Sequence, residues 1–276
     1  MIELTVALPS YRGKYIMWLA LESLCRQKQI DFEWELVVIE EEFECFSEQK
    51  LLKYSKRLKK VGCSKISYTK LKEWIPLAQK WKLIGEKTSD TSRAFLLQAA
   101  DCYSQPYRLT ETFDIIINQD YDWVFSPMGP FYDIPTGELV VYDRLKKDRI
   151  TSTGLNMAIK PYYIKGLPDT ERRKGIDNFI VNLSMKFCKK VNNREFKIKE
   201  NKSENWRYGV DTNGLNNISR NRLKNMRERP NYNRDIKMNI NKILPLDVVK
   251  KLKDCRQYCR EEYIPKKGIY PKKDGE

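Results

Sequence analysis

Three stretches of this sequence share one layout, in which an apolar run ends in acidic or polar residues. They are LTVALPSYR (residues 4–12), WELVVIEEEF (residues 34–43) and RAFLLQAADCYSQPYRL (residues 93–109), and the last places one carboxylate, Asp101, after the run. Short apolar runs followed by turn residues are typical of buried parallel strands, and open α/β sheets bind ligands at the carboxyl ends of such strands. The sequence therefore predicts one site built from three strand ends.

Helical patterns separate the apolar runs. Residues 13–27 place apolar side chains on one stripe, and further helices are expected at residues 47–60 and at residues 75–85, where Pro76 begins the helix. Short strands are expected at residues 65–68 and 94–97. Repeated alternation of strand and helix predicts an α/β fold with a mostly parallel sheet and helices on both faces.

The second half of the chain has a different pattern. Two short β runs flank a turn within residues 121–142, which predicts a small antiparallel β insertion. Apolar residues 176, 179, 180 and 183 predict a helix, and a last helix is expected at residues 245–260. We expect a catalytic domain over residues 1–195 and a basic, partly helical C-terminal extension over residues 196–276.

Composition excludes several classes of function. With no histidine, catalysis by Ser-His or Cys-His pairs is excluded, and seven cysteines without a CxxC pair argue against a zinc module. No apolar run approaches the roughly 20 residues that cross a bilayer, and the amino terminus lacks the features of a signal peptide. We therefore expect a cytoplasmic protein with no transmembrane segment.

The net charge is +15, and it is unevenly distributed. Residues 196–276 contain 21 Lys/Arg against 11 Asp/Glu, a net charge of +10. Such a segment is typical of proteins that contact nucleic acid or an anionic membrane surface, and a solvated charged face is the alternative.

Short motifs in the apolar runs resemble those of the family 2 glycosyltransferases, which have the GT-A fold, a Rossmann-like sheet. The segment VALPSYR is similar to the family's first strand and its following turn, and VVIEEE to the second strand, whose carboxylate binds the nucleobase. LLQAADCYSQP is similar to the strand that ends in the DxD motif. The resemblance implies a donor-binding set of Pro9, Ser10, Tyr11, Arg12, Glu40, Ala100 and Asp101.

The same resemblance implies a mechanism. Asp101 would hold a divalent metal, Mn or Mg, against the diphosphate of a nucleotide-sugar donor, and Lys80 is a further candidate for binding that diphosphate. IDNF is similar to the Glu-Asp pair that opens the acceptor-side helix, which implies Asp177 as general base and an inverting single displacement. Two acids of the family pattern are missing, because Ala99 and Ile176 occupy their positions.

Each site residue also has a simpler interpretation. Asp101 would serve equally as a turn or cap acid, and Asp177 as a first-turn acid that complements the helix dipole. Glu40 is one of three consecutive acids, so the sequence leaves open which one faces a ligand.

The acceptor and the function class are left with alternatives. The basic segment favours a hydroxylated base in DNA as acceptor, as in phage-type DNA modification; a cell-surface or lipid-linked glycan, with peripheral membrane contact, is the alternative. A noncatalytic nucleic-acid-binding α/β module is a further hypothesis. A nucleotidyltransferase ranks last, because PSYRGKY is a poor phosphate loop.

Overall fold

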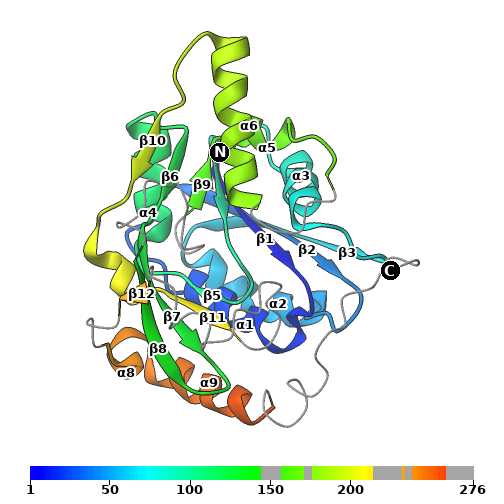
Figure 1. Ribbon diagram of the computed structural model, residues 1–276. Coiled ribbons are helices and arrows are strands. Elements are labelled where there is room, and N and C mark those ends of the chain that lie inside the picture. Colours follow the sequence, from blue (N-terminus) through cyan, green and yellow to red (C-terminus); the bar gives the residue numbers. More distant parts are fainter. Residues whose placement is uncertain (144–156, 171–175, 214–231, 234–237, 259–276) are drawn as a thin grey trace, which may run out of the picture.

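A computed structural model of the chain describes residues 1–143, 157–170, 176–213, 232–233 and 238–258 (Figure 1). It contains a seven-stranded sheet in the order β10-β6-β9-β4-β1-β2-β3 and a five-stranded sheet in the order β12-β8-β7-β11-β5. The strands are β1 (Ile2–Ser10), β2 (Glu33–Glu41), β3 (Cys63–Leu71), β4 (Ala94–Leu97), β5 (Cys102–Tyr103), β6 (Trp123–Phe125), β7 (Met128–Asp133), β8 (Glu138–Asp143), β9 (Met157–Ile159), β10 (Ile198–Glu200), β11 (Val210–Asn213) and β12 (Tyr232–Asn233).

The seven-stranded sheet is mostly parallel, as predicted. β3, β2, β1 and β4 pair in parallel, β9 runs antiparallel between β4 and β6, and β10 pairs in parallel with β6. In the β1–β2 register, Ser10 lies beside Glu40. The carboxyl ends of β4, β1 and β2, which are adjacent strands, therefore lie along one edge of the sheet.

Helices cover both faces of this sheet (Figure 1). Those that bear on the argument are α1 (Met17–Leu24), α2 (Glu48–Lys59), α3 (Leu77–Lys87), α4 (Arg108–Phe113), α5 (Pro161–Lys165) and α6 (Ile176–Phe187). Leu8 of β1 packs in one cluster with α1 and α2, whereas its neighbour Ala7 packs in the other with α3, α5 and α6. This alternation follows from the two-residue period of a strand that is buried on both faces.

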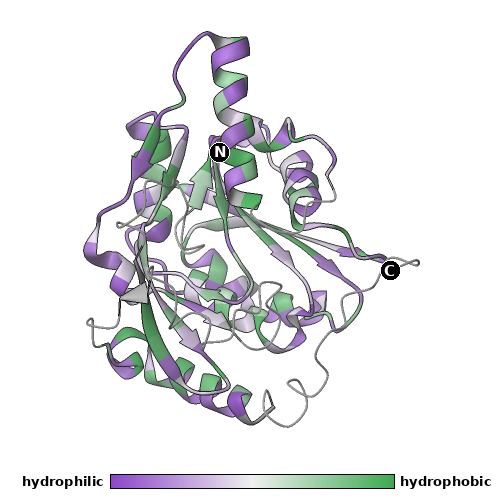
Figure 2. Ribbon diagram, viewed as in Figure 1, coloured by the Kyte–Doolittle hydropathy of each residue, from purple (hydrophilic) through white to green (hydrophobic). Residues whose placement is uncertain are grey.

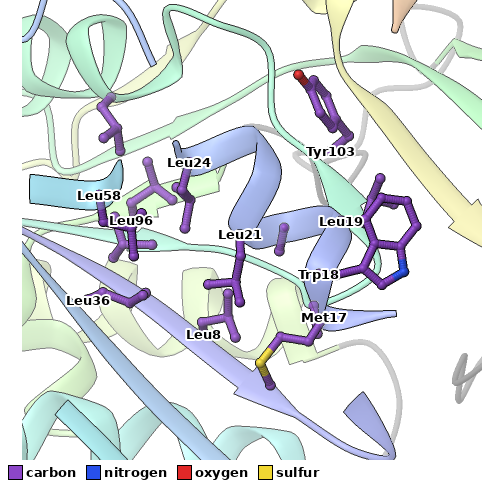
Figure 3. Close-up of a cluster of buried hydrophobic side chains, with 14 of the residues drawn as sticks. Leu8, Met17, Trp18, Leu19, Leu21, Leu24, Leu36, Leu58, Leu96 and Tyr103 are labelled. Atoms are coloured by element: carbon purple, nitrogen blue, oxygen red, sulfur yellow. The ribbon is translucent and has the colours of Figure 1, made fainter. Parts of the chain in front are cut away.

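The α1 side of the core is dense with leucine. Figure 3 shows Leu21 and Leu24 of α1 beside Leu8, Leu36 and Leu96 of the central strands. All five side chains are fully buried. The helix predicted within residues 13–27 forms over Met17–Leu24, and all of its residues except Glu22 are buried.

The antiparallel insertion is confirmed but is larger than predicted. β7 and β8 form the expected hairpin, whose turn includes Gly137 at a φ of +76°. β11 pairs with β7 in parallel and with β5 antiparallel, and β12 pairs with β8. The five-stranded sheet therefore joins segments that are more than a hundred residues apart.

Residues beyond 195 contribute to both sheets. β10 pairs with β6 in the first, and β11 lies inside the second. Helices α8 (Ile240–Ile243) and α9 (Leu246–Tyr258) follow, and α9 confirms the predicted last helix. Figure 2 shows hydrophobic and hydrophilic residues alternating along α9. A domain boundary after residue 195 stays a prediction.

One side chain of α9 ties this helix to the β7–β8 hairpin. Arg256 donates a hydrogen bond from Nε to the Pro135 carbonyl at 3.0 Å and another from Nη2 to the Thr136 carbonyl. Among the helices that the structure describes, none is both long and apolar enough to cross a membrane.

Candidate functional site

The carboxylate of Glu40 joins the loops that follow β1 and β2. Its Oε1 accepts hydrogen bonds from Ser10 Oγ and from the Gly13 amide, both at 3.0 Å, and its Oε2 accepts from the Phe46 amide at 2.8 Å and Tyr68 Oη at 3.1 Å. Burial raises the pKa of Glu40, and these four donors oppose that rise. Glu40 therefore fixes the site's loops, and its predicted contact with a nucleobase stays a prediction.

Lys80, from α3, also lies at the carboxyl ends of β1 and β2. Its buried ammonium donates to the Ser10 carbonyl at 2.7 Å, forms an ion pair with Glu41, and lies 5.7 Å from the centre of the Tyr11 ring. Burial lowers the pKa of Lys80, and the Glu41 carboxylate opposes that shift. Lys80 thus ties α3 to the carboxyl end of β1, beside two of the predicted donor-binding residues.

The backbone reverses at Arg12, which has a left-handed φ of +57°. Its buried guanidinium lies 2.9 Å (Nε) from Glu44 Oε2 and 5.0 Å from the centre of the Phe43 ring. Pro9 lies two residues before Tyr11, inside β1 and beside Ile39. The structure therefore brings Pro9, Ser10, Tyr11, Arg12, Glu40 and Lys80 together at the ends of β1 and β2.

Asp101 lies at the end of β4, in the turn before β5. The Cys102 thiol lies 3.8 Å from Asp101 Oδ1 and 3.2 Å from Oδ1 of Asp211, a residue of β11 that pairs with Cys102 across the ladder. Thr212 Oγ1 donates to the Asp101 carbonyl at 2.7 Å. Strand β11 thus brings a second carboxylate to the position of Asp101, next to the buried Ala100.

This cluster fits a divalent cation. One donor atom from each of Asp101, Cys102 and Asp211 lies within 4.8 Å of the others. Burial raises the pKa of Asp101 to about 6, and burial with the two carboxylates raises that of Cys102 well above its ordinary value. At neutral pH the thiol is therefore neutral, while two carboxylates supply the oxygen ligands that Mg²⁺ and Mn²⁺ prefer.

Arg108 of α4 holds the loop that carries Asp101. Its buried guanidinium donates to Gln98 Oε1 at 2.7 Å, to Ser104 Oγ at 2.8 Å and to the Leu97 carbonyl at 2.7 Å. Burial lowers the pKa of Arg108 to about 9. The two ends of the loop are therefore fixed to one side chain beneath it.

Asp177 is the second residue of α6, as the sequence predicted from the helix stripe. The orientation of its side chain lies outside what the structure describes, so its role as general base stays a prediction.

Sequence reasoning missed Asp211 and Arg108. The β-branched residues Val210 and Thr212 on either side of Asp211 were a signal for a short strand. Its pairing with β5 and β7 could not be deduced, because those strands lie far away in the sequence.

No protein-family model matches the sequence, and no curated protein sequence matches it significantly. Solved structures do match. The fold is similar to that of S. aureus TarS 1-349 in complex with UDP-GlcNAc, with a TM-score of 0.56, 13% sequence identity, and coverage of 95% of this chain and 72% of that one. The same fragment in complex with UDP gives a TM-score of 0.54 and 15% identity, over 77% of this chain and 61% of that one.

The chain is shorter than the protein it resembles. The match with the longer TarS structure has a TM-score of 0.53 and 13% identity, and covers 77% of this chain but only 37% of that one. Together with the strand order of the seven-stranded sheet, these likenesses show that the chain has a GT-A-like fold.

Proposed function

We propose that this chain is a glycosyltransferase that moves a sugar from a nucleotide-sugar donor to an acceptor hydroxyl. The observation that carries the proposal is that the carboxylates of Asp101 and Asp211 lie close together beyond the end of β4. This is the edge of the sheet where α/β folds bind ligands. The structural neighbours were solved with UDP and UDP-GlcNAc, which makes a uridine nucleotide the first donor to test.

In this proposal Asp101 and Asp211 hold Mn²⁺ or Mg²⁺. When bound, the cation supplies positive charge that neutralises the departing diphosphate. Tyr11 and the backbone from Pro9 to Arg12 form the nucleotide side of the site. Glu40 and Lys80 act through those loops, because their polar atoms are bonded to them.

The transfer itself is a single displacement. The acceptor oxygen forms a bond to the anomeric carbon while the bond from that carbon to the diphosphate breaks, and the acceptor proton moves to the Asp177 carboxylate. Attack opposite to the leaving group inverts the configuration at the anomeric carbon. Arg108 keeps the Asp101 loop in place during the reaction.

Two observations bear on the alternatives. The missing acids at Ala99 and Ile176 support a noncatalytic module, whereas Asp211 supplies a second carboxylate beside Asp101. The positive charge of the chain favours an anionic acceptor such as DNA, and a cell-surface or lipid-linked glycan is the alternative.

A thermal-shift screen tests the proposal. UDP, UDP-GlcNAc and GDP-mannose are added with and without MnCl₂, and we expect one nucleotide to stabilise the protein only when metal is present. A ligand at a hundred times its dissociation constant adds about 2.7 kcal/mol, which such a screen detects. No shift with any nucleotide would reject the proposal.

The role of Asp177 needs a separate measurement. Asp177→Asn should leave that thermal shift unchanged and abolish release of the nucleoside diphosphate, whereas the neighbouring exposed residue provides the control Asn178→Ala, with normal turnover. Equal turnover in both variants would remove Asp177 from the mechanism.

A further inference from the structure

The highest density of positive charge in this chain lies within residues 50–72. This segment contains nine Lys/Arg residues and no Asp/Glu. It forms most of α2 and all of β3, the edge strand of the seven-stranded sheet. An uninterrupted basic segment on folded elements presents its charge in a fixed geometry, unlike a solvated tail.

Three lysines form a row along the outer face of α2. Leu51 and Leu58 are fully buried, so the opposite side of the helix carries Lys53, Lys56 and the C-cap residue Lys60, which are all exposed. Spacings of three and four residues place these side chains above one another. We call them the α2 lysine row.

The α2 lysine row is not neutralised by the surrounding protein. Two nearby cations have carboxylate partners: Arg57 pairs with Glu22 at 2.7 Å, and Lys70 with Glu42 at 2.8 Å. The lysines of the row have no ion-pair partner among the residues that the structure describes. Three adjacent cations therefore face solvent together.

The row begins near the candidate site. α2 follows β2 after a short loop, and the Phe46 amide in that loop bonds to Glu40 at 2.8 Å. Because α2 connects the parallel neighbours β2 and β3, this 12-residue helix runs back from the carboxyl end of β2 over about 18 Å, at about 1.5 Å per residue. A linear ligand on the row would thus have one end close to the ends of β1 and β2.

We propose that the α2 lysine row binds a linear phosphodiester polymer that carries the acceptor hydroxyl. That this polymer is the acceptor rests on the proposed glycosyltransferase function. That the row binds the polymer does not depend on that function. A row one lysine wide matches a single anionic chain. A membrane-binding helix would present a broad apolar face, and Leu52, 54% exposed, is the only large aliphatic residue exposed along α2.

The C-terminal helices are a weaker candidate for this contact. On α9 the exposed Lys250 and Lys253 lie among the exposed acids Asp247 and Asp254. They nevertheless provide a matched control, since Lys242, Lys250 and Lys253 are also three exposed lysines.

The test measures binding of a fluorescein-labelled single-stranded oligothymidylate of about 20 nucleotides, a length that covers more than one typical site. The triple variant Lys53→Gln, Lys56→Gln, Lys60→Gln is compared with Lys242→Gln, Lys250→Gln, Lys253→Gln. We expect about a tenfold loss in the first and less than a twofold loss in the second. The slope of log affinity against log salt should fall by about 2 in the first only, at about 0.7 per phosphate contact.

Three outcomes would overturn the proposal: no oligonucleotide binding by the wild type, equal losses in both variants, or a loss in the first variant for phosphatidylglycerol vesicles but not for the oligonucleotide. Nucleotide-induced thermal shifts are recorded for both variants. If those shifts are absent while the row binds the polymer, the glycosyltransferase function fails and the binding surface stands.

Discussion

The Cys102 thiol and the Asp211 carboxylate, 109 positions apart in the sequence, form a hydrogen bond of 3.2 Å between Sγ and Oδ1. This contact exists because β11 enters the second sheet beside β5. Through it, a segment that follows the predicted catalytic domain reaches the end of β4. The candidate metal site therefore depends on chain from both sides of the predicted boundary at residue 195.

Replacing Asp211 should abolish metal binding without unfolding the protein. Asp211→Asn keeps the size of the side chain and removes one of the two carboxylates, so we expect Mn²⁺ affinity to fall by about 100-fold or more, since even groups that only orient metal ligands contribute about 10- to 100-fold. Isothermal titration with MnCl₂ measures the change. Asp254→Asn, an exposed acid on α9, serves as control and should bind Mn²⁺ like the wild type.

Metal binding should weaken in mildly acidic solution. The pKa of Asp101 is raised to about 6 by burial, so its carboxylate gains a proton as the pH falls through about 6, and a proton competes with the cation. The raised pKa has the opposite effect on the metal-free protein, because protonation removes a buried charge. The contribution of Asp101 to stability thus grows as the pH falls through 6.

Thermal shifts with and without MnCl₂, recorded across that pH range, separate the two effects. The Mn²⁺-induced shift should shrink progressively as the pH falls below about 6. An Mn²⁺-induced shift that is as large at about pH 5 as at about pH 7.5 would contradict the assignment of Asp101 as a ligand.

The sequence predicted the elements that form from continuous apolar runs. Strand β4 was predicted with its observed bounds. Ala94 to Leu97 are buried on both faces of the sheet, so they form one continuous apolar run in the sequence. β3 extends well beyond its predicted core of residues 65–68, because most residues of this edge strand are half-buried or exposed and give a weak signal.

The candidate site was predictable only in part. Ser10 and Glu40 were predictable because each stands at the end of an apolar strand, and neighbouring parallel strands bring their ends together. Asp211 was not, since its place depends on pairing with Cys102 from a remote segment. Arg108 was missed because a charged residue gives no sequence signal of burial, and here its cost is offset by hydrogen bonds.

Gly13 should not tolerate a side chain. A Cβ at this position would overlap Glu40 Oε1 and Ser10 Oγ, the atoms that fix the loops after β1 and β2. We expect Gly13→Ala to lower the free energy of unfolding by about 1–3 kcal/mol, as overpacking of a buried site does. Urea denaturation measures the loss.

Gly166→Ala is the matched control for Gly13→Ala. Gly166 is exposed at the end of α5, has a φ of −84°, and a Cβ there would meet the Tyr162 carbonyl at an ordinary 3.4 Å. Its stability should change by less than about 0.5 kcal/mol, as for most surface substitutions. If both variants lost the same free energy of unfolding, the contact with Glu40 would not be what excludes a side chain at position 13.

Loss of Arg108 should affect both stability and the site. Arg108→Met removes the guanidinium that donates to Gln98 and to the Leu97 carbonyl, and Gln98 Oε1 keeps the Ser104 hydroxyl as a second donor. An unsatisfied buried acceptor costs about 1–3 kcal/mol, so the free energy of unfolding should fall by about 1–3 kcal/mol. Because the same side chain fixes the loop of Asp101, Mn²⁺ affinity should fall as well.

The control for Arg108→Met is Arg207→Met, which removes an exposed guanidinium that pairs with Glu204 at 2.6 Å. An exposed ion pair contributes about 0–1 kcal/mol, so this variant should unfold nearly like the wild type and bind Mn²⁺ normally. If Arg108→Met lost stability but kept full Mn²⁺ affinity, Arg108 would support the core without positioning Asp101. If it lost neither, the hydrogen bonds beneath the loop would have no part in holding the site.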